Sequence, residues 1–216
     1  MGRFVSGGRK AASTPESDLS LSLEILVQKH KWKAVKERIH IDPLEPEKEL
    51  KVMTRGGFQA STGMTALHYV CERSPPVEVV EALIEAYPVA CLTRCMPGGC
   101  LPLHIACTWH CSPEVVLALL SADQGGVAVK DELGNLPLHS ACFSGANSAV
   151  IEALLKTDPN SAVARNHQGS RPIDIVRRLR HDNREAVIGL LSKHRRGKSS
   201  GTWSDVAQEA EALGGR

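Results

Sequence analysis

The sequence predicts an all-α fold, a solenoid of stacked helix-turn-helix units, on two observations. A nine-residue segment recurs with a period of 35 or 36 residues, at Gly63–Cys71, Gly99–Cys107, Gly134–Cys142 and, less regularly, Gly169–Arg177. Each copy is followed by a second apolar stripe with helical spacing. A fixed period of this length is typical of proteins in which each unit packs on its neighbours.

The first helix of each unit is predicted to begin at the proline of the segment. Pro102, Pro137 and Pro172 would occupy the first helical position, where a missing N–H costs nothing and the fixed φ favours the helix. The preceding glycine allows a tight turn out of the loop. The leucine, alanine and cysteine that follow are spaced i, i+3 and i+4, so they form one apolar face.

A second helix is predicted in each unit from two apolar pairs four residues apart, which lie on one broad helical face. Ser112 and Asn147 indicate two of the helix starts. The pairs are Val79–Val80 with Leu83–Ile84, Val115–Val116 with Leu119–Leu120, Val150–Ile151 with Leu154–Leu155, and Ala186–Val187 with Leu190–Leu191. One unit cannot bury both of its stripes, so stacking must supply the core.

These features resemble the ankyrin-repeat family, whose motif is Thr-Pro-Leu-His-x-Ala. The resemblance covers roughly residues 19–194. It implies a degenerate cap unit at 19–62 and repeats at about 63–98, 99–133, 134–168 and 169–194. The threonine of the motif is present only as Thr65, so His104 and His139 are expected to lack one hydrogen-bond partner. Longer connections after the second helix explain a period above the usual value of about 33 residues.

Both ends of the chain are predicted to lie outside the repeats. Residues 1–18 are rich in glycine, serine and basic residues without apolar periodicity, which predicts a disordered tail. Gly2 and Ser6 fit an N-myristoylation signal, with an inert tail or an organellar transit segment as the alternatives. Residues 195–216 form a basic tail in which Thr202 and Asp205 would cap a short helix.

Composition favours an intracellular protein. No run approaches the roughly 18–20 apolar residues that span a bilayer, and the start lacks the apolar core of a signal peptide. The seven cysteines are an odd number and lie mostly on predicted apolar faces, which indicates free thiols in a reducing compartment. We therefore expect a monomeric cytoplasmic protein, with nuclear or myristoyl-dependent membrane association as the alternatives.

Charge is distributed unevenly along the chain. Residues 61–160 carry 4 Lys/Arg against 10 Asp/Glu, a net charge of −6, whereas residues 161–198 carry 10 against 3, a net charge of +7. The basic end predicts an acidic partner, or else contact with nucleic acid or an anionic membrane surface. The alternative is that these residues only solvate the outer face of the last repeat.

Signals for chemistry are weak. His-x-x-Cys pairs recur in three units, yet packed helices stand about 8–10 Å apart, too far for pairs from two units to share one zinc ion. Cys91, Cys95 and Cys100 lie near His104 in the sequence but match no common zinc spacing. A phosphate-binding loop and a nucleophile elbow are missing. We expect no enzyme activity, no metal, no cofactor and no small-molecule substrate.

The resemblance implies a partner-binding surface on the concave face and loop tips. In each first helix, the residue after the histidine and the two after the cysteine point away from the apolar stripe. They are Tyr69, Glu72, Arg73, Ile105, Thr108, Trp109, Ser140, Phe143 and Ser144, and the loop tips add Arg94, Lys130, Glu132 and His167. Exposed aromatic groups make binding hot spots. The alternative is that Trp109 and Phe143 pack under the loops as core.

Overall fold

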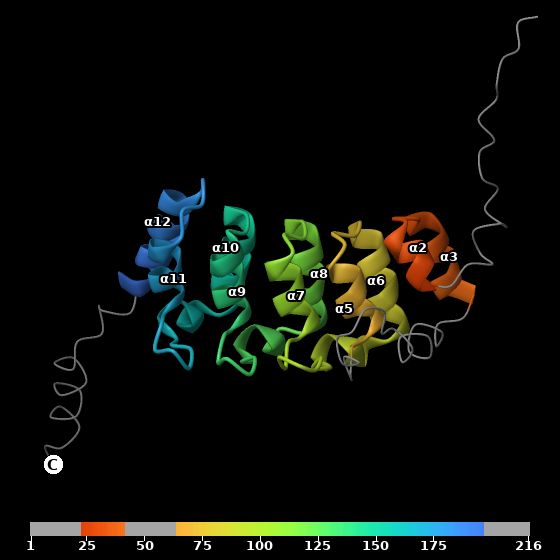
Figure 1. Ribbon diagram of the computed structural model, residues 1–216, viewed down its shortest axis with the longest axis horizontal. Coiled ribbons are helices and arrows are strands. Elements are labelled where there is room, and N and C mark those ends of the chain that lie inside the picture. Colours follow the sequence, from red (N-terminus) through yellow and green to blue (C-terminus); the bar gives the residue numbers. More distant parts are fainter. Residues whose placement is uncertain (1–22, 42–63, 197–216) are drawn as a thin grey trace, which may run out of the picture.

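The described part of the chain is a row of helix pairs (Figure 1). The structure is a computed structural model that describes residues 23–41 and 64–196. Its pairs are α2 (Leu23–Gln28) with α3 (Trp32–Ile41), α5 (Ala66–Cys71) with α6 (Val77–Ala86), α7 (Pro102–Thr108) with α8 (Pro113–Ala122), α9 (Pro137–Ser144) with α10 (Ser148–Thr157), and α11 (Pro172–Arg178) with α12 (Arg184–Arg196). The predicted all-α solenoid is confirmed.

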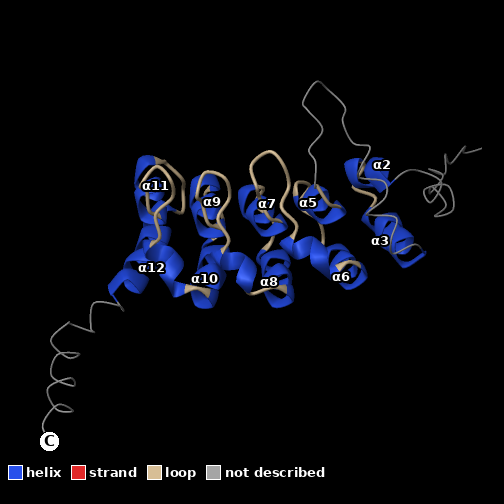
Figure 2. Ribbon diagram, turned by 90° about the horizontal axis from the view of Figure 1, so that it is seen from below, coloured by secondary structure: helices blue, strands red, loops and turns tan. Residues whose placement is uncertain are grey.

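The helices lie in two layers along the array (Figure 2). The first helices α5, α7, α9 and α11 form one layer, and the second helices α6, α8, α10 and α12 form the other. Consecutive helices of each layer contact one another, as α7 does α9 and α8 does α10. One cluster of buried Leu, Val, Ile, Ala and Cys side chains runs between the layers through all the described units.

The observed helices begin where the sequence predicts them to begin. Pro102, Pro137 and Pro172 are the first residues of α7, α9 and α11, and Asn147 caps α10 through its side chain. All four members of the stripes in α8 and α10 are buried. The predicted stripes of α6 and α12 are less completely buried: Ile84 and Leu190 are half-buried and Ala186 is exposed.

A 3-10 helix and a loop connect each of three pairs to the next. The 3-10 helices are η2 (Pro88–Leu92), η3 (Gly125–Ala128) and η4 (Pro159–Val163). The loops project at one edge of the array (Figure 1), and we name them finger 1 (94–100), finger 2 (130–135) and finger 3 (165–170). Each finger turns the chain back to the start of the next first helix.

A buried histidine joins each of three first helices to the following finger. Nε2 of His68, His104 and His139 donates to the carbonyl oxygens of Cys100, Asn135 and Ser170 at 3.1, 3.2 and 3.2 Å. Nδ1 of each ring accepts the backbone N–H three residues earlier. Only His68 also meets a threonine hydroxyl, that of Thr65 at 2.9 Å, as the missing threonines predict.

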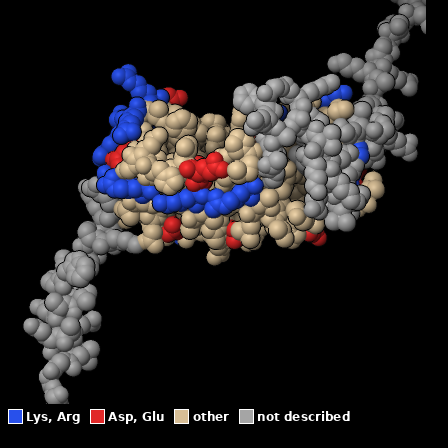
Figure 3. Space-filling model, turned by 60° about the horizontal axis from the view of Figure 1, so that its bottom comes forward, with Lys and Arg blue, Asp and Glu red and all other residues tan. Residues whose placement is uncertain are grey.

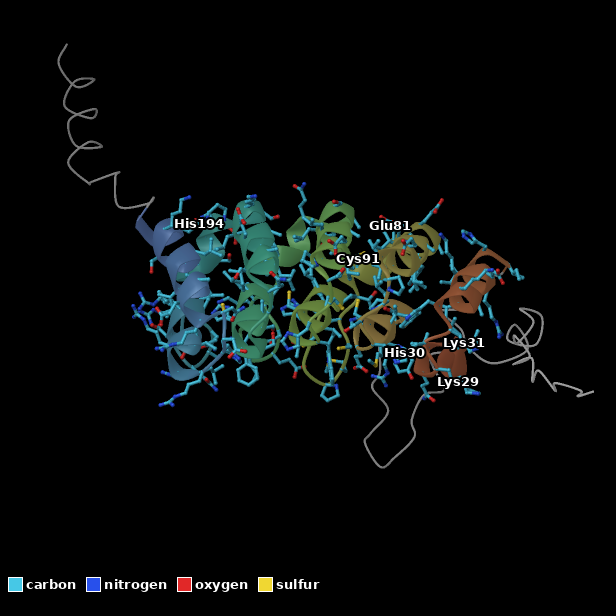
Figure 4. The ribbon with its side chains drawn as sticks, turned by 90° about the horizontal axis from the view of Figure 1, so that it is seen from above. Lys29, His30, Lys31, Glu81, Cys91 and His194 are labelled. Atoms are coloured by element: carbon cyan, nitrogen blue, oxygen red, sulfur yellow. The ribbon has the colours of Figure 1, made fainter. Side chains whose placement is uncertain are left out.

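The first pair lies where the sequence predicts the first unit, and α3 packs on α6. Lys29, His30 and Lys31 lie together at this end of the array, opposite His194 on α12 (Figure 4). The predicted tail at 1–18, the lipidation signal at Gly2, the connection at 42–63 and the helix starting at Thr202 fall outside the described residues. Within the described ranges, no helix is long and apolar enough to cross a membrane.

Candidate protein-interaction surface

Two of the predicted partner-binding side chains are large, apolar and exposed. Trp109, at the C-terminal end of α7, is 49% exposed, and Phe143, in the last turn of α9, is 63% exposed. The alternative prediction that these two side chains belong to the core is therefore wrong. They belong to neighbouring units and follow the equivalent buried histidines, His104 and His139, by five and four residues.

The other predicted apolar members of this surface are less available. Tyr69 and Ile105 are half-buried and pack against the core. Arg73 covers the Tyr69 ring, with its guanidinium carbon 5.1 Å from the ring centroid, and also pairs with Glu72 at 3.5 Å. The continuous patch of four large apolar groups that the sequence predicts is thus reduced to two exposed aromatic side chains.

The predicted polar members of the first helices mostly serve the fold. Thr108 donates its hydroxyl to the carbonyl of His104 in its own helix at 2.9 Å. Ser144 donates to the carbonyl of Cys107 in the preceding unit at 2.8 Å, which ties α9 to α7. Ser140 is half-buried and lines a cavity between α9 and the fingers.

The predicted loop-tip residues hold the fingers in register. Arg94 donates through Nη1 to the carbonyls of Gly99 and Lys130 at 2.9 and 2.7 Å. Lys130 donates in turn through Nζ to the carbonyl of Arg165 at 3.1 Å. Glu132 accepts the N–H of Gly98 at 3.2 Å, while the backbone of exposed His167 donates to Leu133 at 3.0 Å. Each finger is therefore bonded to the next.

A cavity of about 290 Å³ lies between fingers 2 and 3 and the inner faces of α7, α9 and α11. Its apolar wall includes two side chains that are more than half exposed, Leu133 at 61% and Phe143. Its lining residues are Thr108, Leu133, Asn135, His139, Ser140, Phe143, Asn166, Gln168, Ser170, Ile175, Arg178 and Leu179. Three of the predicted site residues, Thr108, Ser140 and Phe143, meet in this one place.

The contribution of the last repeat to this cavity was not predicted from the sequence. Ile175, Arg178 and Leu179 stand thirty-five residues after Ser140, Phe143 and Ser144. Extending the same periodic positions into the last repeat would have identified them. Leu133, which precedes the glycine of its segment, has no such signal in the sequence.

Basic side chains border the cavity. Figure 3 shows a band of Lys and Arg across the face that carries the fingers, with a small acidic group beside it. Arg177, Arg178 and Arg180 are exposed and form no salt bridge with any described residue. Asp174 does not offset this charge, because Arg171 pairs with it at 2.9 Å and lowers the pKa of its carboxyl to about 2.

The ring nitrogens of the buried histidines are occupied and unavailable to a metal. Nε2 faces a carbonyl oxygen, which can only accept, so each ring is the neutral tautomer with its proton on Nε2. Burial lowers the pKa of all three histidines, that of His68 to about 4. Among the described residues, no three His, Cys, Asp or Glu side chains are grouped to hold an ion.

Comparison with known proteins agrees with this architecture. Residues 44–131 match the family model described as ankyrin repeats (3 copies). A search of the curated proteins finds no match to the chain. The pairs α9–α10 and α11–α12, which follow the matched region, repeat the proline start of α7 and the two-layer packing of the matched units. The family match over residues 44–131 and the helix pairs that continue the same architecture support an ankyrin-repeat protein.

Proposed function

We propose that the chain is a non-catalytic module that binds a partner protein through Trp109, Phe143 and the cavity beside Phe143. Ankyrin repeats generally mediate binding to other proteins. The observation that carries the proposal is the exposure of two large aromatic side chains on neighbouring units, one of them lining a cavity of about 290 Å³. Aromatic anchors and the pockets next to them contribute most of the energy of many interfaces.

The energetic reason is the cost of leaving such groups in water. A fully buried aromatic side chain gains roughly 1.5–3 kcal/mol relative to an exposed one. Trp109 and Phe143 forgo part of this gain in the free chain, and a partner that covers them recovers it. The fingers, which are bonded to one another, offer a rim whose backbone is already ordered, so less entropy is lost on binding.

The test compares Trp109→Ala with Leu117→Ala. Leu117 is a matched control because it is 51% exposed but lies on α8, in the other helix layer. Proteins captured by the full chain from its native cells are quantified by mass spectrometry, and the affinity of each purified partner is then measured. Trp109→Ala should weaken binding by about 2 kcal/mol, roughly thirtyfold, and Leu117→Ala should not.

Thermal melting separates a binding role from a folding role. Both variants should melt as the wild type does, because each side chain is about half exposed. A Trp109→Ala chain that binds normally but melts early would assign Trp109 to the fold and contradict the proposal.

We further propose that the partner presents an acidic segment that carries an apolar side chain. Leu133, Phe143, Ile175 and Leu179 supply an apolar wall, and Arg178 is the one charged group in the cavity lining. Arg177 and Arg180, its neighbours in the sequence, are also exposed and basic. A carboxylate near these guanidinium groups gains from charge-assisted hydrogen bonds.

Arg178→Glu tests this chemistry, with Lys156→Glu as the control of equal charge change. Lys156 pairs with Glu152, and both lie on α10, in the layer of second helices. Arg178→Glu should reduce the affinity for a captured partner about tenfold or more through repulsion of its carboxylates, whereas Lys156→Glu should change it little. Equal effects of the two variants would contradict a local acidic contact.

The basic band also supports a second candidate, the binding of nucleic acid or an anionic membrane. That reading predicts a steep loss of affinity with rising salt. It also predicts that Trp109→Ala leaves binding unchanged. The comparison of Trp109→Ala with Leu117→Ala therefore distinguishes the two functions.

A further inference from the structure

The three fingers share one backbone closure. The first residue of the turn donates its N–H to the carbonyl at the far end, from Cys95 to Cys100 at 2.9 Å, from Asp131 to Asn135 at 2.9 Å and from Asn166 to Ser170 at 3.1 Å. The same carbonyls accept the buried histidines of the preceding helices. The far end of each finger is thus part of the contact between two units.

Fingers 2 and 3 add a second closure made by a side chain. In finger 2, Oδ1 of Asp131 accepts the N–H groups of Leu133 and Asn135 at 2.9 and 2.7 Å. In finger 3, Oδ1 of Asn166 accepts from Gln168 at 3.1 Å and from Ser170 at 2.9 Å. An Asp or Asn at this position is the usual means of fixing a tight turn.

Finger 1 has cysteines at both of the corresponding positions. Cys95 replaces the Asp or Asn at the start of the turn, and Cys100 stands where Asn135 and Ser170 stand in the other fingers. A thiol is too weak an acceptor to fix the turn as a carboxylate does. The contact of Cys100 Sγ with the backbone of the turn is a long one, 3.8 Å to the carbonyl of Gly98. Finger 1 therefore lacks the side-chain closure of its two neighbours.

The two cysteines are placed for covalent closure instead. They face each other as an antiparallel bridge pair. Opposite residues in such a pair have Cα atoms about 4.5–5.5 Å apart, and disulfides span about 4.4–6.8 Å. Cys100 is partly exposed and Cys95 is 8% exposed, so a small reagent reaches the pair from solvent. The interaction with the Cys100 thiol lowers the pKa of Cys95 to about 7 and raises that of Cys100.

We propose that Cys95 and Cys100 form a reversible disulfide that closes finger 1, by exchange with a small-molecule disulfide such as glutathione disulfide. The Cys95 thiolate attacks one sulfur of glutathione disulfide and releases one glutathione thiolate. The Cys100 thiolate then attacks the Cys95 sulfur of the mixed disulfide and releases the second. The protein loses two protons and two electrons; the electrons reduce glutathione disulfide, and the two glutathione thiolates take up the protons to give two molecules of glutathione.

The consequence reaches beyond the turn itself. Closing the ring fixes the Cys100 carbonyl, which receives His68 from the preceding unit. It also fixes the backbone of Gly98, which bonds to Glu132 of finger 2, and that of Gly99, which accepts from Arg94 of finger 1. Oxidation would thereby stiffen the N-terminal half of the finger row.

The buried thiols provide an internal control. Cys71 and Cys111 also lie close together, with Cys111 Sγ donating to the carbonyl of Cys71 at 3.1 Å. They are 0% and 3% exposed, so the surrounding core shields them from a reagent in solvent. Proximity alone would oxidise both pairs, whereas proximity with access selects Cys95 and Cys100.

The experiment equilibrates the full chain in glutathione buffers of increasing oxidised fraction, blocks the remaining free thiols and measures intact mass. Two of the seven thiols should escape blocking, and peptide mapping should join Cys95 to Cys100. Added excess glutathione should restore all seven. Amide hydrogen exchange at Gly99 should slow in the oxidised form, because its N–H bonds to the Cys95 carbonyl.

Three variants complete the test. Cys95→Ser and Cys100→Ser should each abolish the loss of two thiols, while Cys71→Ser should retain it. Retention of all seven free thiols in every buffer would overturn the proposal. A disulfide between Cys71 and Cys111 would also overturn it, as would a mixed disulfide with glutathione that does not proceed to the Cys95–Cys100 disulfide. None of these results bears on whether Trp109 binds a partner, so the two proposals stand or fall separately.

Discussion

At the scale of single residues, the three buried histidines couple stability to pH. Each is neutral in the folded chain and uses both ring nitrogens. Protonation of Nδ1 would turn the acceptor of a backbone N–H into a donor and break that bond. Burial adds the cost of a charge in an apolar environment, which is why the pKa of each is lowered.

The expected result is a loss of stability in mild acid. Unfolded histidines take up protons below about pH 6.5, while folded His68 stays neutral to about pH 4, so the unfolded state binds more protons in this window. Stability is complete above the unfolded pKa and falls as pH drops from about 6.5 toward 4. A shift of this size corresponds to about 3 kcal/mol for His68 alone.

Urea unfolding at several pH values between 7.5 and 4.5 measures this effect. His167→Gln is the control: its side chain is exposed, so the profile should not change. Asp174, whose pKa is lowered to about 2, loses its contribution only below about pH 4, outside the window. A free energy of unfolding that stays constant from pH 7 to 5 would contradict the role given to the histidines.

At the scale of single elements, helices with the same packing begin in different ways. The side chain of Asn147 accepts the N–H of Ala149 at 2.9 Å at the start of α10. Ser112 occupies the equivalent position before α8 but makes no such bond. Pro113 follows Ser112 and carries no N–H, so the start of α8 has one donor fewer to satisfy.

Alanine substitution should separate these two caps. Asn147→Ala should lower the free energy of unfolding by about 1 kcal/mol, because the N–H of Ala149 loses its acceptor. Ser112→Ala should cost clearly less, since no cap bond is lost. Chemical denaturation of the two variants beside the wild type measures the difference, and equal losses would show that the Asn147 bond adds nothing.

The helices could be predicted from the sequence because the signals for them are local. Proline at the first helical position and apolar pairs four residues apart are read within a few residues, so the start of α9 at Pro137 and the buried stripe of α10 were predictable. The surface was less predictable, because exposure depends on neighbouring units. Tyr69 and Trp109 belong to the same predicted surface, yet Tyr69 packs on the core and Trp109 is exposed.

Contacts between fingers could not be read from the sequence. Arg94 donates to a backbone carbonyl thirty-six residues away. Every residue has such a carbonyl, so the type of residue at that position does not indicate the contact. The cavity shows the same limit: Leu133 is an ordinary loop residue until the fold brings it beside Phe143 and Leu179. The pairing of Cys95 with Cys100 likewise emerges only once finger 1 is compared with its neighbours.

At the scale of the whole molecule, the array is a series of units joined by one repeated set of contacts. In three consecutive units a buried histidine bonds to the finger that follows, and the two helix layers continue without interruption from α5 to α12. The exposed aromatic groups, the cavity and the basic band all belong to this arrangement rather than to one unit. Binding properties therefore depend on how many units are stacked and in what order.

The series of bonds from a buried histidine to the following finger does not continue at Asp174. This residue stands in the place of the histidine in the last repeat, and it accepts the N–H of Arg171 at 3.1 Å as an imidazole would, while its other contacts go to the Arg171 side chain. An imidazole there would need a carbonyl from a following finger. Lengthening the array by tandem duplication at this end would therefore demand an Asp-to-His exchange at the junction, whereas a duplication between His104 and His139 would need no new side chain.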